Sequence, residues 1–264
     1  MRVIVTGGNS GVGKATAAAL AADGHSVLIA CRDVDKGRRV ASEMTRDVEV
    51  AALDLADLAS VRSFADSVES VDVLVNNAGV MGMPLTRTTD GFESHIGINH
   101  LGHFALTCLL ADRITDRVIS VASATYLFAT LHLDDLNWHR RKYSKWSAYG
   151  ESKLANLLFV AELANRGVRA YATDPGATDT DITRSLGMGE HQRIRRLMHT
   201  PAQGARATLQ AVTTDLPSGT YLAPLFNQLG RPKVTRLRRK AVDPAMAHRL
   251  WDASADLTGC DWPR

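Results

Sequence analysis

The chain has 264 residues, of which 45% are hydrophobic, and a formal net charge of +3. This length and composition allow a substantial core and fit one large α/β domain better than two. The small net charge gives no reason to expect a nucleic-acid partner. Three scattered cysteines, Cys31, Cys108 and Cys260, match neither a zinc-ligand spacing nor a disulfide framework, which favours a reducing, cytoplasmic setting. No apolar stretch approaches the ~18 residues of a membrane span, so we expect none, and we expect no signal peptide.

Short apolar runs alternate with helical patterns along the first half of the chain. The runs that predict strands lie at 2–6, 26–31, 48–53, 71–76 and 117–123. The segments between them combine alanines, charges and spaced apolar residues, which is typical of helices. A long helix is predicted over about 147–165, followed by a strand at 167–173. This alternation predicts a parallel sheet covered on both faces, with right-handed crossovers.

A glycine-rich turn, TGGNSGVGKA, follows the first predicted strand directly. Its glycines are spaced G-x-x-x-G-x-G, unlike the G-x-G-x-x-G of many dinucleotide-binding folds. Glycines in such a turn let backbone N–H groups approach a pyrophosphate at the positive end of the next helix. We therefore predict nucleotide binding, with contacts from Gly7, Asn9, Ser10, Gly11, Val12 and Gly13.

The end of the second predicted strand, LIACRD, bears on which nucleotide binds. A carboxylate at the strand tip would accept hydrogen bonds from the ribose 2′-OH and repel a 2′-phosphate. Asp33 lies 20 residues beyond Gly13, but the apolar run ends at Cys31, so we predict that Asp33 caps the next helix. Arg32 then suits a phosphate, and Lys14 adds a second positive charge nearby. These features favour NADP(H) over NAD(H).

Another candidate feature is the stretch AYGESKLANLLF, which places Lys153 four residues after Tyr149 on the same helix face. A free phenol has a pKa of ~10, and a neighbouring cation favours its ionised form. Tyr149 is the only tyrosine with a lysine four residues later. The pair fits proton transfer, although the spacing alone is equally typical of a solvated helix surface.

Several motifs occur together and in order: TGGNSGVG, NNAG at 76–79, a serine after the fifth strand and YGESK at 149–153. Together they resemble the short-chain dehydrogenase/reductase family over nearly the whole chain. ACRDVDKG, INHLGHF, DDLNW and RLWDASADLTG are most similar to its retinol dehydrogenase branch. The resemblance implies one doubly wound Rossmann domain of about seven parallel strands over residues 1–264, with a substrate-binding region from about 177.

The resemblance also implies roles for individual residues. Tyr149 would exchange a proton as hydride moves between nicotinamide and a carbonyl, and Lys153 would bind the nicotinamide ribose. Ser123 would bond the substrate oxygen, and Asn99 would help to hold a water for proton relay. Asn76 would help to stabilise the sheet. The other implied cofactor contacts are Asp54, Leu55, Asn77, Ala78, Gly79, Pro175, Gly176, Thr178 and Thr180.

The function that follows is NADP(H)-dependent interconversion of a small carbonyl compound and an alcohol. One alternative is reduction of an activated C=C bond, as the related protochlorophyllide reductases perform with the same Tyr/Lys pair. Another is a catalytically silent NADP(H) sensor. Family habit implies a homodimer or homotetramer built on the helix of Tyr149. The retinol dehydrogenase branch commonly carries a membrane-attaching N-terminal extension, whereas the glycine turn here begins at residue 6, so membrane residence and retinoid substrates are not carried over.

Several features are interpreted as non-catalytic. Ser120 is expected on a strand and Ser147 as a helix cap, and His100 with His103 is too small a set for a metal site. The insert between Ser123 and Tyr149 is expected over the sheet edge or substrate cleft. Three further segments carry weaker expectations. Residues 80–95, 125–146 and 181–200 should shape the pocket. The basic cluster at 191–197 could select acidic or phosphorylated substrates, or it could equally be an exposed helix face. The basic run 231–240 is expected to be a solvated, mobile loop, and contact with a phosphate, a lipid headgroup or nucleic acid is the less favoured alternative.

Overall fold

The computed structural model describes residues 1–180, 198–225 and 229–263. In these ranges eight strands form one sheet in the order β3-β2-β1-β4-β5-β6-β7-β8. Seven strands are parallel, and β8 runs antiparallel to β7. The doubly wound sheet is therefore confirmed, with one strand more than expected. The strands are β1 (Arg2–Thr6), β2 (Ser26–Cys31), β3 (Glu49–Ala52), β4 (Val71–Asn76), β5 (Ile114–Val121), β6 (Ala170–Thr173), β7 (Tyr221–Leu225) and β8 (Leu229–Val234).

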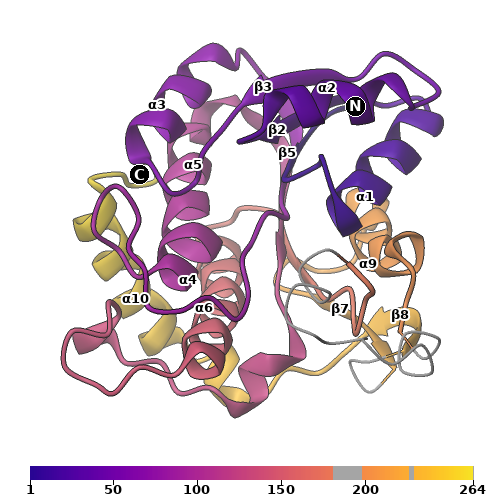
Figure 1. The fold of residues 1–264 in the computed structure, drawn as a ribbon. Coiled ribbons are helices and arrows are strands. Elements are labelled where there is room, and N and C mark those ends of the chain that lie inside the picture. Colours follow the sequence, from indigo (N-terminus) through magenta and orange to yellow (C-terminus); the bar gives the residue numbers. More distant parts are fainter. Residues whose placement is uncertain (181–197, 226–228, 264) are drawn as a thin grey trace.

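Helices cover both faces of the sheet (Figure 1). One face carries α1 (Gly11–Ala22), α2 (Val34–Ser42) and α9 (Pro201–Thr213). The other carries α3 (Leu58–Ser67), α4 (Ser94–Ile96), the π-helix η1 (Gly97–Leu101), α5 (Gly102–Leu109), α6 (Lys145–Asn165) and α10 (Pro244–Thr258). Short 3₁₀ turns complete the chain: η2 (Ala111–Arg113), η3 (Ala124–Phe128), η4 (Leu133–Asp135) and η5 (Arg239–Ala241). Each face of the sheet thus has its own apolar core.

Predicted and observed boundaries agree where the apolar pattern is strong. β1, β2 and β4 have the predicted bounds, whereas β5 begins and ends earlier than the predicted 117–123. The predicted cap Ser147 is wrong. Ser144 precedes α6, and its hydroxyl accepts a hydrogen bond from the Ser147 N–H. The helix consequently starts at Lys145 because the earlier serine satisfies its free N–H groups.

The basic run 231–240 is not a loop throughout. Its first four residues belong to β8, which pairs with β7 at the sheet edge. An edge strand needs only one hydrogen-bonded neighbour, so it tolerates Pro232 and outward-pointing cations. At the other end of the run, the Lys240 ammonium donates to the carbonyls of Leu127 and Ala129. The Lys240 ammonium therefore helps to hold the fold together.

The C-terminal helix α10 packs against α6 and covers part of it (Figure 1). Phe159 of α6 stacks on Trp251 of α10 at 5.8 Å between ring centroids, and Phe104 of α5 meets both rings. The subunit contact expected on the helix of Tyr149 remains a prediction, and α10 leaves less of that helix free for it.

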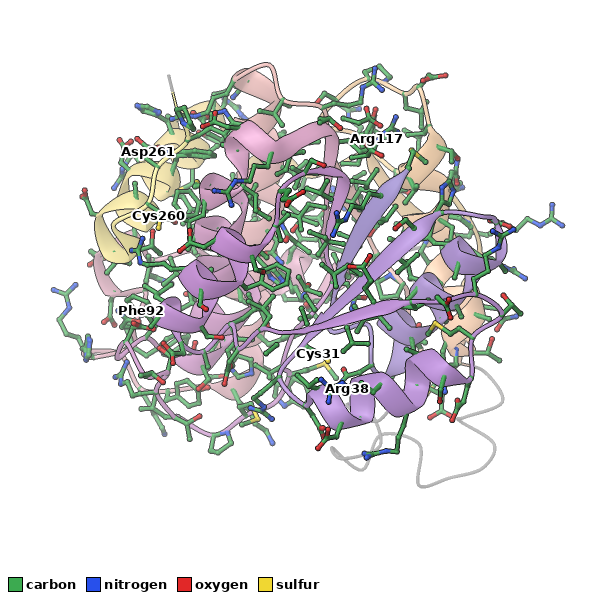
Figure 2. All side chains as sticks on the ribbon, turned by 90° about the horizontal axis from the view of Figure 1, so that it is seen from above. Cys31, Arg38, Phe92, Arg117, Cys260 and Asp261 are labelled. Atoms are coloured by element: carbon green, nitrogen blue, oxygen red, sulfur yellow. The ribbon has the colours of Figure 1, made fainter. Side chains whose placement is uncertain are left out.

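All three cysteines are buried and free. Figure 2 places Cys31 beside α2 and Cys260 on the opposite side of the molecule, after α10. The expectation that the chain has no disulfide framework agrees with this placement. Among the described residues, no helix is both long and apolar enough to cross a bilayer.

We expect Phe159→Ala to lower the free energy of unfolding by about 3–5 kcal/mol, because loss of the ring would leave a cavity between α6 and α10 and remove its contact with Trp251. Phe128→Ala is the matched control: Phe128 is 92% exposed, so its loss should change stability by about 0.5 kcal/mol or less. Urea denaturation followed by circular dichroism measures both. Equal losses in the two variants would contradict the described packing of α6 and α10.

Candidate active site

The predicted site residues converge at the carboxyl edge of the sheet. The strand order reverses between β1 and β4, and ligands of doubly wound sheets bind at such a reversal. The glycine turn follows β1, Asn77 follows β4, Ser123 lies beyond β5, and the 175–180 segment follows β6. The fold therefore brings together segments that are far apart in the sequence.

The glycine turn is packed too tightly for side chains. Gly7 has a φ of +65°, and a Cβ on Gly13 would lie 2.4 Å from the Gly7 carbonyl oxygen and 2.5 Å from Asn77 Nδ2. A Cβ on Gly11 would lie 3.2 Å from the Thr180 methyl, so the 175–180 segment reaches this turn. Ser10 precedes α1 and makes no side-chain capping bond. The first N–H groups of α1 are thus left to bind an anion from outside the helix.

The Thr6 hydroxyl at the end of β1 joins three segments. His103 Nδ1 lies 3.1 Å from the Asn99 carbonyl oxygen, which only accepts, so Nδ1 carries the ring proton. His103 Nε2 then accepts from the Thr6 hydroxyl at 2.8 Å. The Thr6 oxygen accepts from the N–H groups of Asn77 and Ala78. Burial lowers the pKa of His103 to about 4, which keeps the ring neutral in this role.

Tyr149 and Lys153 lie one turn apart on α6 and face the same site, as predicted. Lys153 is 4% exposed, and its ammonium donates to the Val121 carbonyl at 2.9 Å and lies 5.8 Å from the Tyr149 ring centroid. Ser123 lies beside the Tyr149 hydroxyl. The burial of Lys153 argues against the interpretation of this pair as a solvated helix surface.

The pKa of Tyr149 is raised, whereas the neighbouring lysine was expected to lower it. Although the ring keeps some solvent access, protein surrounds the hydroxyl, and this burial raises the phenol pKa above its ordinary value. The hydrogen bond with Ser123 opposes that rise. Burial lowers the pKa of Lys153 to about 8, and the negative charge of Asp174 opposes the fall. Burial of both groups therefore outweighs the attraction between cation and phenolate that the spacing suggested.

Asn99 lies in the π-helix η1 and holds the active-site backbone. Its side chain accepts from the Val80 N–H at 2.7 Å and donates to the Val80 carbonyl at 3.0 Å and to Ser152 Oγ at 2.9 Å. Ser152 in turn donates to the Tyr149 carbonyl. Asn99 thus fixes the turn of α6 that carries Tyr149 and Lys153.

The tip of β2 separates the two candidates for recognising the ribose. Asp33 accepts from the Lys36 N–H and caps α2, as predicted. Arg32 is exposed and bonds no other residue in the described ranges. Asn9 donates to the Asp33 carbonyl at 3.4 Å, so the glycine turn lies beside this tip. Lys14 pairs with Glu43 at 2.6 Å, which takes up the second positive charge expected there.

The remaining predicted contacts line the same edge. Asp54 and Leu55 follow β3, and Asp54 Oδ1 accepts from the Ala56 N–H. A Cβ on Gly79 would lie 3.7 Å from Lys153 Nζ, which brings the NNAG segment next to the lysine. Asn76 instead donates to Thr107 and joins β4 to α5. Thr178 donates to the Pro175 carbonyl, which keeps the 175–180 segment folded back.

Comparison with known proteins identifies this arrangement. Residues 1–133 match the short chain dehydrogenase family. Retinol dehydrogenase 12 of Mus musculus is 42% identical, over 98% of this chain and 87% of that protein. The chain belongs to the short-chain dehydrogenase/reductase family. Its similarity to the retinol dehydrogenase branch is likewise confirmed.

Two solved structures extend the comparison. An uncharacterized protein from Mycobacterium Paratuberculosis is 46% identical with a TM-score of 0.89, covering 100% of this chain and 95% of that one. A short chain dehydrogenase from Burkholderia cenocepacia J2315 in complex with NADP is 26% identical with a TM-score of 0.65, covering 83% and 94%. This dehydrogenase/reductase therefore shares its fold with a relative that holds a nicotinamide cofactor.

The residues of this dehydrogenase/reductase fit such a cofactor. Gly7, Gly11 and Gly13 let the turn pack closely against its neighbours, and the uncapped start of α1 suits a pyrophosphate. Lys153 stands beside Gly79 at the same edge of the sheet. These residues would hold the two ends of a dinucleotide.

Within the segments 80–95 and 125–146, sequence reasoning did not single out a buried cluster that borders Tyr149. The His95 ring lies 6.1 Å from the Tyr149 ring, centroid to centroid. Its Nε2 accepts from the Met83 N–H, and its Nδ1 donates to Glu93 at 2.8 Å, while the Tyr143 hydroxyl donates to the same carboxylate. Burial raises the Glu93 pKa, but the hydrogen bonds from His95 and Ile96 outweigh it and hold the pKa below its ordinary value. No motif signalled this wall of the site.

The insert between Ser123 and Tyr149, which was expected over the sheet edge or the substrate cleft, is joined to α6 by an ion pair. Arg141 donates to both oxygens of Glu151, at 2.8 and 3.2 Å, and to Asp135 at 3.1 Å. Its guanidinium lies 3.8 Å from the ring centroid of Trp138, whose φ of +53° is strained for an L residue. The ion pairs hold this strained turn in place, so the insert forms a rigid border two residues beyond Tyr149.

Two further histidines act through hydrogen bonds. His199 donates to the Pro175 carbonyl and accepts from the Gly230 N–H, and so ties the 175–180 segment to β8. His100 bonds Ser254 of α10. In the part of the chain that the structure describes, no three metal-ligating side chains cluster. The basic cluster at 191–197 and residues 181–197 of the expected pocket lie outside the described residues.

We expect Thr6→Val to lower the free energy of unfolding by about 3 kcal/mol, because the buried His103 Nε2 and the partly buried Ala78 N–H lose their partner. Thr125→Val is the matched control, since Thr125 Oγ1 is buried and bonds no described residue. That change should cost about 0.5 kcal/mol or less. Chemical denaturation compares them, and Thr6→Ser should retain most of the stability. A Thr6→Val protein as stable as the wild type would disprove the hydroxyl's role.

Proposed function

We propose that the chain is an NADP(H)-dependent oxidoreductase that interconverts a small carbonyl compound and an alcohol. The observation that carries this proposal is the buried Lys153 one helical turn from Tyr149, with Ser123 beyond β5 at the same edge of the sheet. A phenol, a hydroxyl and an ammonium gathered in this way can bind and protonate one oxygen. The same set would be unnecessary in a silent sensor.

Each residue has a separate part in the reaction. Tyr149 delivers its phenolic proton to the oxygen of the reduced carbonyl, or removes it during oxidation, and Ser123 bonds the same oxygen. Lys153 binds the ribose beside the nicotinamide, and its cation stabilises the phenolate once the proton has left. Asn99 keeps Tyr149 and Lys153 in register through Ser152. When bound, the cofactor supplies or accepts the hydride.

Preference for NADP(H) over NAD(H) rests on Arg32. It stands exposed at the tip of β2, while Asp33, the residue that could oppose a 2′-phosphate, is engaged as the cap of α2. A guanidinium binds phosphate through charge-assisted hydrogen bonds. The Burkholderia cenocepacia relative in complex with NADP supports the same choice.

Reduction of an activated C=C bond is the second candidate reaction, because the same Tyr149–Lys153 pair could protonate a carbon. Substrate tests with aldehydes, ketones, quinones, enones and retinal separate carbonyl reduction from C=C reduction, since C=C reduction alone would leave the carbonyl intact. Retinal is included because the relatives are named retinol dehydrogenases.

We also propose a cytoplasmic setting and, by family habit, a homo-oligomer.

We expect Tyr149→Phe to lower kcat by about 10²–10⁴-fold, because only the proton-transferring hydroxyl is removed. The Kd for NADPH should change little. Initial rates with NADPH and NADPH fluorescence measure the two quantities. Tyr171→Phe is the control, because the Tyr171 hydroxyl donates to the Leu216 carbonyl in the core on the opposite face of the sheet from α6. Normal turnover by Tyr149→Phe would refute the mechanism.

We expect Arg32→Ala to weaken NADPH binding about 10–100-fold and to leave NADH binding nearly unchanged, because one charge-assisted contact to the 2′-phosphate is lost. Arg38→Ala is the control on the neighbouring helix α2, since the Arg38 side chain is exposed and pairs with Asp35 at 3.7 Å on the same helix. Titration with both cofactors measures the ratio of the two Kd values. An unchanged ratio would assign the preference to other residues.

A further inference from the structure

His95 is a buried imidazole whose two ring nitrogens are both hydrogen-bonded. It lies in α4 and is 0% exposed. A backbone N–H can only donate, so Nε2 accepts from the Met83 N–H at 3.2 Å. Nδ1 therefore carries the proton of the neutral ring and donates to Glu93 Oε1 at 2.8 Å. Since each nitrogen has its own partner, rotation of the ring would break both hydrogen bonds.

The Glu93 carboxylate holds the imidazole in this orientation. It is also 0% exposed, and its other oxygen accepts from the Ile96 N–H at 3.0 Å. The Tyr143 hydroxyl donates to Oε1 at 2.9 Å, and the Glu93 N–H donates to Asn137 Oδ1 at 2.9 Å. Charge-assisted hydrogen bonds from several donors give a buried carboxylate one geometry. His95 is therefore held by a group that α4 and the insert fix together.

The His95 ring packs against the ring of Tyr149. The two centroids are 6.1 Å apart and the rings are inclined at 65°, which is an edge-to-face arrangement. Tyr149 is partly exposed, so the core does not surround its ring on every side. Among the described residues, His95 supplies the one aromatic ring in contact with it, and the Lys153 ammonium lies 5.8 Å from its centroid. The orientation of the phenol consequently depends on where His95 is held.

The position of the phenolic oxygen is sensitive to that orientation. This oxygen lies at the far end of the side chain, so a small rotation about the Cα–Cβ bond moves it farther than any other ring atom. A misplacement of ~1 Å at a reacting group can cost about 10²-fold in rate. We propose that His95 is a positioning residue that fixes the ring of Tyr149 for proton transfer. The kinetic part of this inference rests on the proposed function, whereas the part that concerns the orientation of the ring is independent of any reaction.

Two substitutions remove the imidazole and each keep one of its hydrogen bonds. In His95→Gln the amide oxygen can accept from the Met83 N–H, and in His95→Asn the shorter amide can donate to Glu93. Both variants lose the ring that contacts Tyr149. Each should lower kcat about 10–100-fold and leave KM within about twofold of the wild type, because only the placement of the transferred proton changes. Initial rates with NADPH and the most active aldehyde or ketone of the substrate panel measure both constants.

His100→Gln is the matched control. His100 is also a buried histidine, its Nε2 is hydrogen-bonded to Ser254, and its ring meets that of Phe159 edge-on at 5.9 Å. These contacts face α10 rather than Tyr149. The kcat of this variant should stay within about twofold of the wild type.

A double-mutant cycle separates positioning from a purely structural role. If His95 acts through the Tyr149 hydroxyl, His95→Gln should change the residual rate of Tyr149→Phe by less than about twofold. A histidine that only supports the fold would instead lower the rate by the same factor in both backgrounds. That result would overturn the inference.

A second readout needs no turnover. The ¹³C–¹H order parameter of the Tyr149 ring, identified by its loss in Tyr149→Phe, measures how tightly the ring is held on the ps–ns timescale. It should fall in His95→Gln and His95→Asn and keep its value in His100→Gln. An unchanged order parameter in the His95 variants contradicts the proposal. If circular dichroism shows that one of them does not fold, the other decides, and failure of both would show that His95 serves the fold alone.

The two readouts distinguish this inference from the proposed function. Absence of any carbonyl reduction by the wild type would overturn the proposed function. In that case the order parameters still decide whether His95 fixes the ring of Tyr149.

Discussion

The Thr6 hydroxyl is the contact on which the rest of the site depends. It stands where the strand order reverses, and it joins the end of β1 to the NNAG backbone and, through His103, to the helix of Asn99. Thr6 and His103 are buried and the NNAG groups are partly buried, so the hydroxyl fixes the distance between the end of β1, the NNAG segment and the helix of Asn99. A neutral histidine is required because Nε2 must accept a hydrogen bond while Nδ1 donates one.

Beyond Thr6, buried polar side chains that have hydrogen-bond partners hold the site together. Asn99 binds the backbone of Val80 and the side chain of Ser152, and Lys153 binds the Val121 carbonyl. Burial sets the pKa values of Tyr149 and Lys153 more strongly than their mutual attraction does. The negative charge of Asp174 opposes the fall in the Lys153 pKa that burial causes. The chemistry of the pair thus depends on residues outside it.

Ion pairs and hydrogen bonds hold the border of the site that the insert and the His95 cluster form. Arg141 joins Glu151 to Asp135 and stacks on Trp138, while Tyr143 and His95 share the Glu93 carboxylate beside Tyr149. Partly buried ion pairs of this kind contribute more to a unique geometry than to stability. We infer that this border restricts which substrates reach Tyr149, since a wall held by several hydrogen bonds adapts poorly to a new shape.

The sequence by itself determined the doubly wound sheet, the glycine turn, the cap at Asp33 and the Tyr149–Lys153 pair. These features depend on local periodicity, on backbone freedom at glycine and on spacing along one helix, all of which can be read from neighbouring residues. The structure alone revealed β8, the start of α6 at Lys145, the direction of the Tyr149 pKa and the partners of Asp174, His95 and His199. Each of these depends on groups that are distant in the chain: an edge strand needs a neighbour, a pKa depends on the atoms that exclude water, and a buried carboxylate acquires its role only from the donors that the fold brings to it.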